Sequence, residues 1–119
     1  MKSVIVSLFV IFLTGAARVE AHAFVKDAEP SVGSTIETSP GEVRIRFTEN
    51  VEQAFSSIQV FDVSGKEVDK RDVHLDRSDR ALLHVSLPRL GAGLYKVVWR
   101  VVSVDTHVTN GSFTFRVSR

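Results

Sequence analysis

The stretch from Gly93 to Val117 constrains the fold more than any other part of this 119-residue chain. Its apolar residues occupy every second position, first at Tyr95, Val97, Trp99 and Val101 and then at Phe113, Phe115 and Val117. This period-two alternation is typical of β-strands that bury one face. Asn110-Gly111 is a common turn sequence, so we expect the chain to fold back there into a β-hairpin.

The loop between these two expected strands contains Asp105 and His107. In extended backbone, residues two positions apart project to the same side. A carboxylate and an imidazole are therefore expected side by side at the mouth of the hairpin, where they would form half of a metal site. Taken alone, an Asp-x-His sequence in a loop is more often a turn aspartate next to a solvated histidine.

Shorter strand-like segments occupy most of the remaining chain. They are expected at Phe24–Glu29, Glu42–Phe47, residues 58–63, a polar edge strand at Glu67–Val73, and residues 82–87. Turn residues separate them, and no useful segment shows a helical period. About seven short strands predict an all-β domain, either a sandwich or a small Greek-key barrel. We expect a core that includes Val43, Ile45, Phe47, Val97, Trp99, Phe113 and Phe115.

Residues 1–21 have the organisation of a secretory signal peptide. Lys2 precedes a ten-residue apolar run at Val4–Leu13, and small residues follow. Ten apolar residues are too few to span a bilayer, which takes about 20. An uncleaved anchor is the alternative interpretation.

Two cleavage positions satisfy the small-residue rule, one after Ala17 and one after Ala21. We favour the cut after Ala21, which makes residues 22–119 the secreted domain and His22 its first residue.

Composition excludes several classes of protein and site. The chain has no cysteine, which excludes disulfides, thiolate metal sites and a blue-copper centre. Met1 is its single methionine, so the expected secreted domain contains no sulfur. A formal charge of +1 shows no basic excess of the kind that nucleic-acid binding requires.

Several sequence phrases together resemble the CopC family of periplasmic copper-resistance proteins. They are His22 directly after the signal peptide, Pro30 with Gly33-Ser34, VRIRFTENV from Val43, GLYKVVWRVVSVDTH from Gly93, and GSFTFRV from Gly111. The resemblance covers essentially all of residues 22–119, and the block that ends in DTH is its most specific part.

The resemblance implies a seven-stranded Ig-like or cupredoxin-like Greek-key sandwich that binds copper in the periplasm. It implies Cu(II) ligation by the amine and ring of His22 together with Asp105 and His107, with Glu49 as a weak or nearby ligand. It further implies a non-enzymatic, monomeric domain outside the membrane, which passes copper to a CopD-type inner-membrane transporter.

Two positions depart from the family pattern. Val108 stands where the family usually has proline after DTH, so the loop is less rigidly set. Some members carry a methionine-rich loop that binds Cu(I), whereas the matching residues 63–80 contain no methionine. Because soft sulfur ligands select Cu(I), we expect one Cu(II) per mature chain and no Cu(I) site.

The donor types support Cu(II) independently, because tetragonal nitrogen and oxygen coordination suits this ion and Cu(II) leads the divalent stability order. Two other classes stay open, a copper-dependent oxidative enzyme with an N-terminal histidine chelate and an Ig-like interaction module without metal. We interpret His84 as a surface-facing or hydrogen-bonded histidine, and His74 as part of a solvated charged loop.

Overall fold

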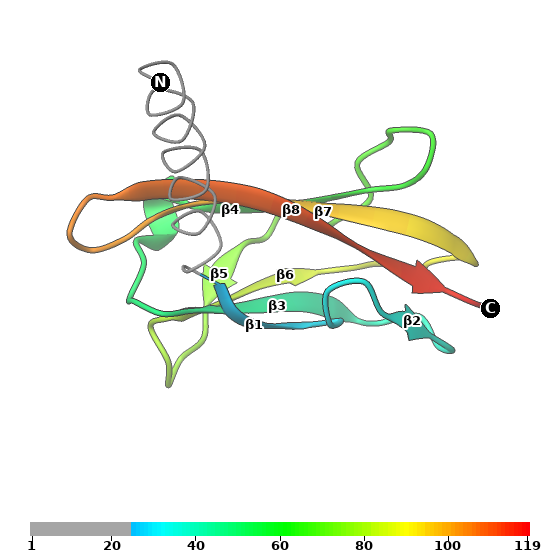
Figure 1. Ribbon diagram of the computed structural model, residues 1–119, viewed down its shortest axis with the longest axis horizontal. Coiled ribbons are helices and arrows are strands. Elements are labelled where there is room, and N and C mark those ends of the chain that lie inside the picture. The colour runs from blue at the N-terminus through cyan, green and yellow to red at the C-terminus, as the bar shows by residue number, and fades with distance from the viewer. Residues whose placement is uncertain (1–24) are drawn as a thin grey trace, which may run out of the picture.

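The structure is a computed structural model that describes residues 25–119, and these residues form eight strands and one short 3₁₀ helix (Figure 1). The elements are β1 (Val25–Glu29), β2 (Thr35–Ile36), β3 (Glu42–Phe47), η1 (Gln53–Phe55), β4 (Ser57–Phe61), β5 (His74–Leu75), β6 (Leu82–Ser86), β7 (Gly93–Val102) and β8 (Val108–Val117). His22 and Phe24, which the sequence placed at a metal site and at the start of the first strand, lie outside the described residues. Within residues 25–119, no helix is long and apolar enough to cross a membrane.

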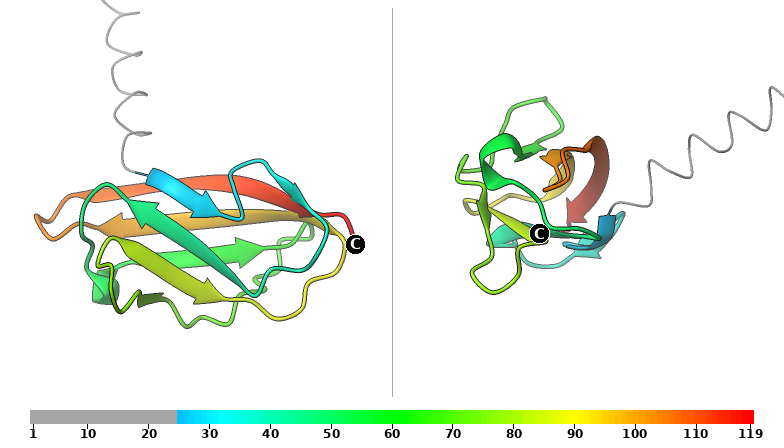
Figure 2. Two further views of the ribbon diagram at one scale, coloured as in Figure 1. Left: turned by 90° about the horizontal axis from the view of Figure 1, so that it is seen from below. Right: turned by 90° about the vertical axis from the view of Figure 1, so that its left-hand side faces the viewer.

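The strands form two four-stranded sheets that face each other and do not close into a barrel (Figures 1 and 2). The first sheet has the order β1-β3-β6-β5 with antiparallel pairing throughout. The second has the order β2-β8-β7-β4, in which β2 runs parallel to β8. The predicted all-β sandwich is therefore confirmed, with its barrel variant excluded.

The core lies between the sheets and consists of the alternating residues that the sequence indicated. All seven predicted core residues are buried, namely Val43, Ile45, Phe47, Val97, Trp99, Phe113 and Phe115. Phe47 of the first sheet meets Trp99 of the second edge to face, with ring centroids 5.4 Å apart. Offset and edge-to-face contacts of this kind stabilise aromatic pairs beyond the burial of their area.

The β7–β8 hairpin is longer than predicted, because its turn does not use Asn110-Gly111. Asn110 pairs with Arg100 and Gly111 pairs with Trp99, so both lie inside β8. The turn instead follows Val102 and precedes Val108, the last pair of the ladder. The hairpin tip projects from one end of the sandwich, at the left of Figure 1.

The edge of the sandwich near residues 66–70 also differs from the prediction. Glu67–Val73 is not a regular strand, and the edge strand is instead β5, two residues long. The Val68 N–H donates to the Val60 carbonyl of β4 at 2.8 Å, and the Lys70 N–H donates to the Ser86 carbonyl of β6 at 2.9 Å. The segment therefore crosses from one sheet to the other and links their edges.

Candidate metal centre

A tight turn at the tip of the β7–β8 hairpin brings Asp105 and His107 together. The Thr106 N–H donates to the Ser103 carbonyl at 2.8 Å, and the Ser103 N–H donates to the His107 carbonyl at 2.9 Å. Thr106 takes up the left-handed conformation with φ of 71°. This is the three-residue hairpin loop in which a β-turn is followed by a left-handed residue.

The expected proximity of the two side chains is confirmed, although the turn produces it and not extended backbone. His107 Nδ1 lies 3.3 Å from Asp105 Oδ1. Both side chains are open to solvent, with 78% of His107 and 54% of Asp105 exposed. A carboxylate and an imidazole are thus presented together at the end of the molecule, where an ion can reach both.

The Asp105 carboxylate is stabilised in its ionised form. The Ser103 hydroxyl donates to Asp105 Oδ1, and this bond is the main reason that the pKa of Asp105 lies below its ordinary value. The nearby His107 ring lowers the pKa of Asp105 further. Asp105 therefore carries a negative charge at neutral pH, as a metal ligand or an acceptor for imidazole N–H must.

Ser103 itself was not identified from the sequence. It is fully buried and forms an isolated bridge with Val51, directly after β7. A serine at the end of an apolar strand has no distinctive sequence signature. The informative signal was its position two residues before Asp105, because serine hydroxyls frequently bond to groups close by in the chain.

Glu49 lies in the loop after β3, which runs beside the hairpin turn. The neighbouring Asn50 carbonyl accepts the Val104 N–H at 3.1 Å. Glu49 is exposed, and its carboxylate makes no hydrogen bond or ion pair with any residue of 25–119. The structure therefore brings the Glu49 loop to the hairpin tip, without a hydrogen bond or ion pair between Glu49 and the Asp105–His107 pair.

The start of β1 lies at this same end of the sandwich, since Val25 pairs with Phe47, the last residue of β3. His22 precedes Val25 by three residues and is outside the described part of the chain. Among residues 25–119, no group of three or more histidine or carboxylate side chains is arranged to hold a metal ion. The described residues thus supply a donor pair, and a complete metal site needs at least one further donor.

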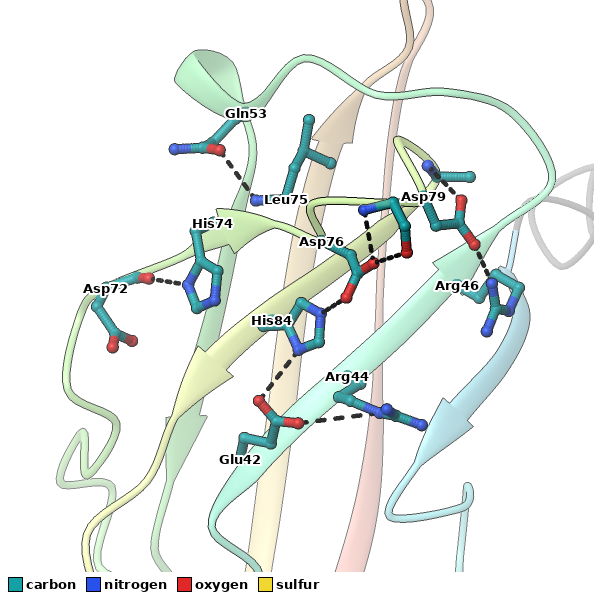
Figure 3. Close-up of polar contacts among 12 residues, drawn as sticks. Glu42, Arg44, Arg46, Gln53, Asp72, His74, Leu75, Asp76, Asp79 and His84 are labelled. Atoms are coloured by element: carbon teal, nitrogen blue, oxygen red, sulfur yellow. Dashed lines mark hydrogen bonds and ion pairs between the residues drawn. The ribbon is translucent and has the colours of Figure 1, made fainter.

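The histidines of the opposite sheet form a different arrangement, shown in Figure 3. His84 is buried on β6, where Nδ1 lies 3.0 Å from Glu42 Oε1 and Nε2 lies 2.9 Å from Asp76 Oδ1. The His74 ring stacks on His84 with centroids 5.1 Å apart and an interplanar angle of 7°. Parallel rings direct their in-plane nitrogens side by side, so the lone pairs do not converge on one ion.

His84 is therefore a hydrogen-bonded structural residue, one of the two interpretations drawn from the sequence. Because ionised carboxylates only accept, both ring nitrogens can donate at once only in the protonated ring. The hydroxyl and backbone N–H of Ser78, followed by His84, lower the pKa of Asp76 to about 2. His74 is exposed, and its Nδ1 lies 2.8 Å from the Asp72 carbonyl oxygen.

The fold and the Asp105–His107 pair define a class of protein, a small open β-sandwich that presents nitrogen and oxygen donors at one end. The family model described as the CopC domain matches residues 25–118. The chain therefore belongs to the CopC family, which confirms the resemblance found in the sequence.

Individual relatives agree with this assignment. Copper resistance protein C of Pseudomonas syringae pv. tomato is 30% identical over 118 residues, covering 94% of this chain and 93% of that protein. Copper transport protein CutJ of Bacillus subtilis is 29% identical over 117 residues, which cover 98% of this chain. This chain spans 21% of the length of CutJ. The crystal structure of CopC from Methylosinus trichosporium superposes with a TM-score of 0.75 at 36% identity, covering 82% of this chain and 94% of that one.

Proposed function

We propose that this chain is a copper-binding protein of copper resistance that works in the periplasm and binds one Cu(II) ion per mature chain. The observation that carries the proposal is the Asp105–His107 pair, whose facing atoms lie 3.3 Å apart on an exposed turn. Membership of the CopC family and the printed names of two relatives, a copper resistance protein and a copper transport protein, support copper as the cargo.

The proposed ligands are His107, Asp105 and the amine and ring of His22, with Glu49 as a weak or nearby ligand. Three residues of extended chain span at most about 11 Å, so His22 cannot lie farther than that from Val25. Val25 is paired with Phe47, two residues before Glu49. These chain lengths are compatible with a site made from the N-terminus, the Glu49 loop and the hairpin tip.

The oxidation state follows from the donor set. An amine, two imidazoles and a carboxylate form a nitrogen and oxygen site of the kind that Cu(II) prefers. The chain has no cysteine and its one methionine is Met1, so residues 22–119 offer Cu(I) no sulfur ligand. We therefore propose a Cu(II) carrier without a Cu(I) site.

The remaining parts of the proposal concern processing and delivery. Cleavage after Ala21 would give His22 the free amine that the chelate requires. The secreted domain, residues 22–119, then acts as a monomeric, non-enzymatic carrier and passes copper to a CopD-type transporter in the inner membrane.

The decisive experiment compares two forms of the domain in a Cu(II) titration. One begins at His22, and the other carries a single alanine before His22, which converts the amine into an amide. A free α-amine has a pKa of about 7.7–8.0, so metal binding at neutral pH should release its proton. We expect tight one-to-one binding with proton release for the first form and a large loss of affinity for the second.

His74→Ala in the form that begins at His22 is the matched control and should bind Cu(II) normally. Equal Cu(II) affinity in the native and extended forms would remove His22 as a terminal chelating ligand. Failure of the native form to bind Cu(II) at all would contradict the proposed function as a whole.

A further inference from the structure

We infer that Ser103 is the positioning residue that fixes Asp105 and His107 in the orientation in which they bind metal. The inference rests on the proposed copper function and assigns a role to a residue that contacts no metal itself. It follows from three features of the hairpin tip: the bonds of Ser103, the atoms that these bonds leave free, and the conformation of Thr106.

All polar groups of Ser103 bond to Asp105, Thr106 or His107. Its N–H donates to the His107 carbonyl at 2.9 Å, and its carbonyl accepts the Thr106 N–H at 2.8 Å. Its hydroxyl oxygen accepts the His107 N–H at 3.2 Å and donates to Asp105 Oδ1. The hydroxyl also lies 3.4 Å from the His107 carbonyl oxygen, a longer contact than the one to Asp105.

Ser103 is fully buried, so water does not compete for these bonds. Its backbone is anchored on the other side by the bridge to Val51. The two exposed site residues are therefore attached to a serine that belongs to the rigid interior. Rigid support of this kind keeps metal ligands close to the geometry that binding requires.

The hydroxyl also determines which atoms remain available to a metal. Asp105 Oδ1 accepts from Ser103 and faces His107 Nδ1, whereas Oδ2 has no hydrogen bond or ion pair to any residue of 25–119. The Asp105 carboxylate is thus held through Oδ1 by the buried serine, and its second oxygen, Oδ2, is left for an ion at the surface.

The turn needs this support because of its backbone. Thr106, between the two ligands, has φ of 71°, and β-branched residues rarely adopt the left-handed conformation. Without the Ser103 hydroxyl, the turn would lose two of the hydrogen bonds that hold it. The unfavourable conformation of Thr106 would then no longer be offset by these bonds.

Ser56 provides a matched control on the opposite side of the end of β7. Its hydroxyl donates to the Glu52 carbonyl at 2.7 Å and accepts the Val102 N–H at 3.1 Å. It thus makes two bonds like those of Ser103, next to the same strand end, without contacting Asp105 or His107. Loss of the Ser56 hydroxyl should loosen the end of β7 without changing how Asp105 and His107 are oriented.

The test measures Cu(II) affinity by chelator competition and the Cu(II) EPR spectrum in Ser103→Ala, Ser56→Ala and the native domain. We expect Ser103→Ala to lower Cu(II) affinity about 10- to 100-fold and to change the EPR spectrum, in line with the loss of other groups that orient metal ligands. Ser56→Ala should retain native affinity and spectrum even if its melting temperature falls. Native affinity in Ser103→Ala, or an equal loss in Ser56→Ala, would overturn the inference.

A second measurement uses the metal-free native domain and so does not depend on how Ser103→Ala folds. Amide hydrogen exchange followed by NMR should show that the His107 N–H, which donates to the buried Ser103 hydroxyl, is protected, and fast exchange at this amide would overturn the inference. The proposed function is contradicted if the native domain binds no Cu(II), or if His107→Ala binds Cu(II) as tightly as the native domain does. If Cu(II) binding depends on His107 but not on Ser103, the proposed function stands and only the inference about Ser103 is contradicted.

Discussion

The indole ring of Trp99 lies directly over Gly111, its partner across the β7–β8 ladder. A Cβ atom at position 111 would lie 2.7 Å from Trp99 Cζ2 and 3.0 Å from Cε2. Real Cβ atoms do not approach other heavy atoms this closely, so the side chain of Trp99 occupies the space that any larger residue would need. Gly111 is therefore a packing residue of the core hairpin.

Gly111→Ala should consequently destabilise the domain by about 1–3 kcal/mol, because the buried Trp99 ring must shift to admit a methyl group. Urea unfolding followed by tryptophan fluorescence would measure the change. Gly91→Ala is the control, since a Cβ there meets no atom within 4 Å. Equal stability of the Gly111→Ala and native proteins would contradict the packing described for Trp99.

Thr106→Asn should stabilise the metal-free domain by up to about 1 kcal/mol, because asparagine tolerates the left-handed conformation that Thr106 adopts at φ of 71°. The melting temperature would report the gain. Thr114→Asn is the matched control on an exposed, extended position of β8, where the same change should be neutral or unfavourable. A fall in melting temperature for Thr106→Asn would argue against the left-handed turn.

His107→Ala should weaken Cu(II) binding by more than about tenfold, equivalent to 1.4 kcal/mol, because the site loses one nitrogen donor. Asp105→Ala should act in the same direction. His74→Ala should leave Cu(II) affinity unchanged, since its ring lies on the other sheet and stacks on His84. Similar losses in all three variants would indicate non-specific binding to exposed side chains.

His84→Ala should destabilise the domain by about 1–3 kcal/mol, because Glu42 and Asp76 both lose their contact with the His84 ring, which is only 10% exposed. His74→Ala should cost much less, as His74 is exposed. Chemical denaturation of both variants would measure the difference, and equal costs would show that the Glu42 and Asp76 contacts contribute little.

Stability should fall in acid between about pH 4 and pH 2. Hydrogen bonds lower the pKa of Asp76 to about 2 and lower those of Asp62 and Asp72 in the folded state. A group with a lower pKa when folded takes up protons first in the unfolded chain, so its contribution is present above about pH 4 and lost as pH falls. Urea midpoints measured from pH 7 to pH 2 would show this, and Asp76→Asn should flatten the curve.

The long alternating strands could be predicted from sequence, whereas the shortest could not. β3, β7 and β8 each contain at least three inward residues, which is enough for a period to be visible. β2 and β5 have two residues each and exist because Ile36 reaches Val117 and Leu75 reaches Leu83. Such pairs depend on distant partners, so the chain shows eight strands in the described residues where about seven were predicted.

Of the candidate site, only the proximity of Asp105 and His107 could be predicted and is confirmed. Asp105 and His107 are close in sequence, which was sufficient to expect their proximity, although a tight turn and not extended backbone brings them together. Asn110-Gly111 was misassigned because a glycine needed for contact with Trp99 has the same local sequence as a turn. The roles of Ser103 and of the Asn50–Val104 contact depend on which groups become buried, and only the folded structure contains that information.

The position of β8 between β2 and β7 affects the order in which the two sheets form. Thr35 and Ile36 pair with Arg116 and Val117, so β2 has no partner in its sheet until residues 116 and 117 have been synthesised. β7, which precedes β8, likewise lacks its main partner until then. Because long-range pairing of this kind forms slowly, we expect the second sheet to assemble later than the first, whose strands β1, β3, β5 and β6 all precede residue 87.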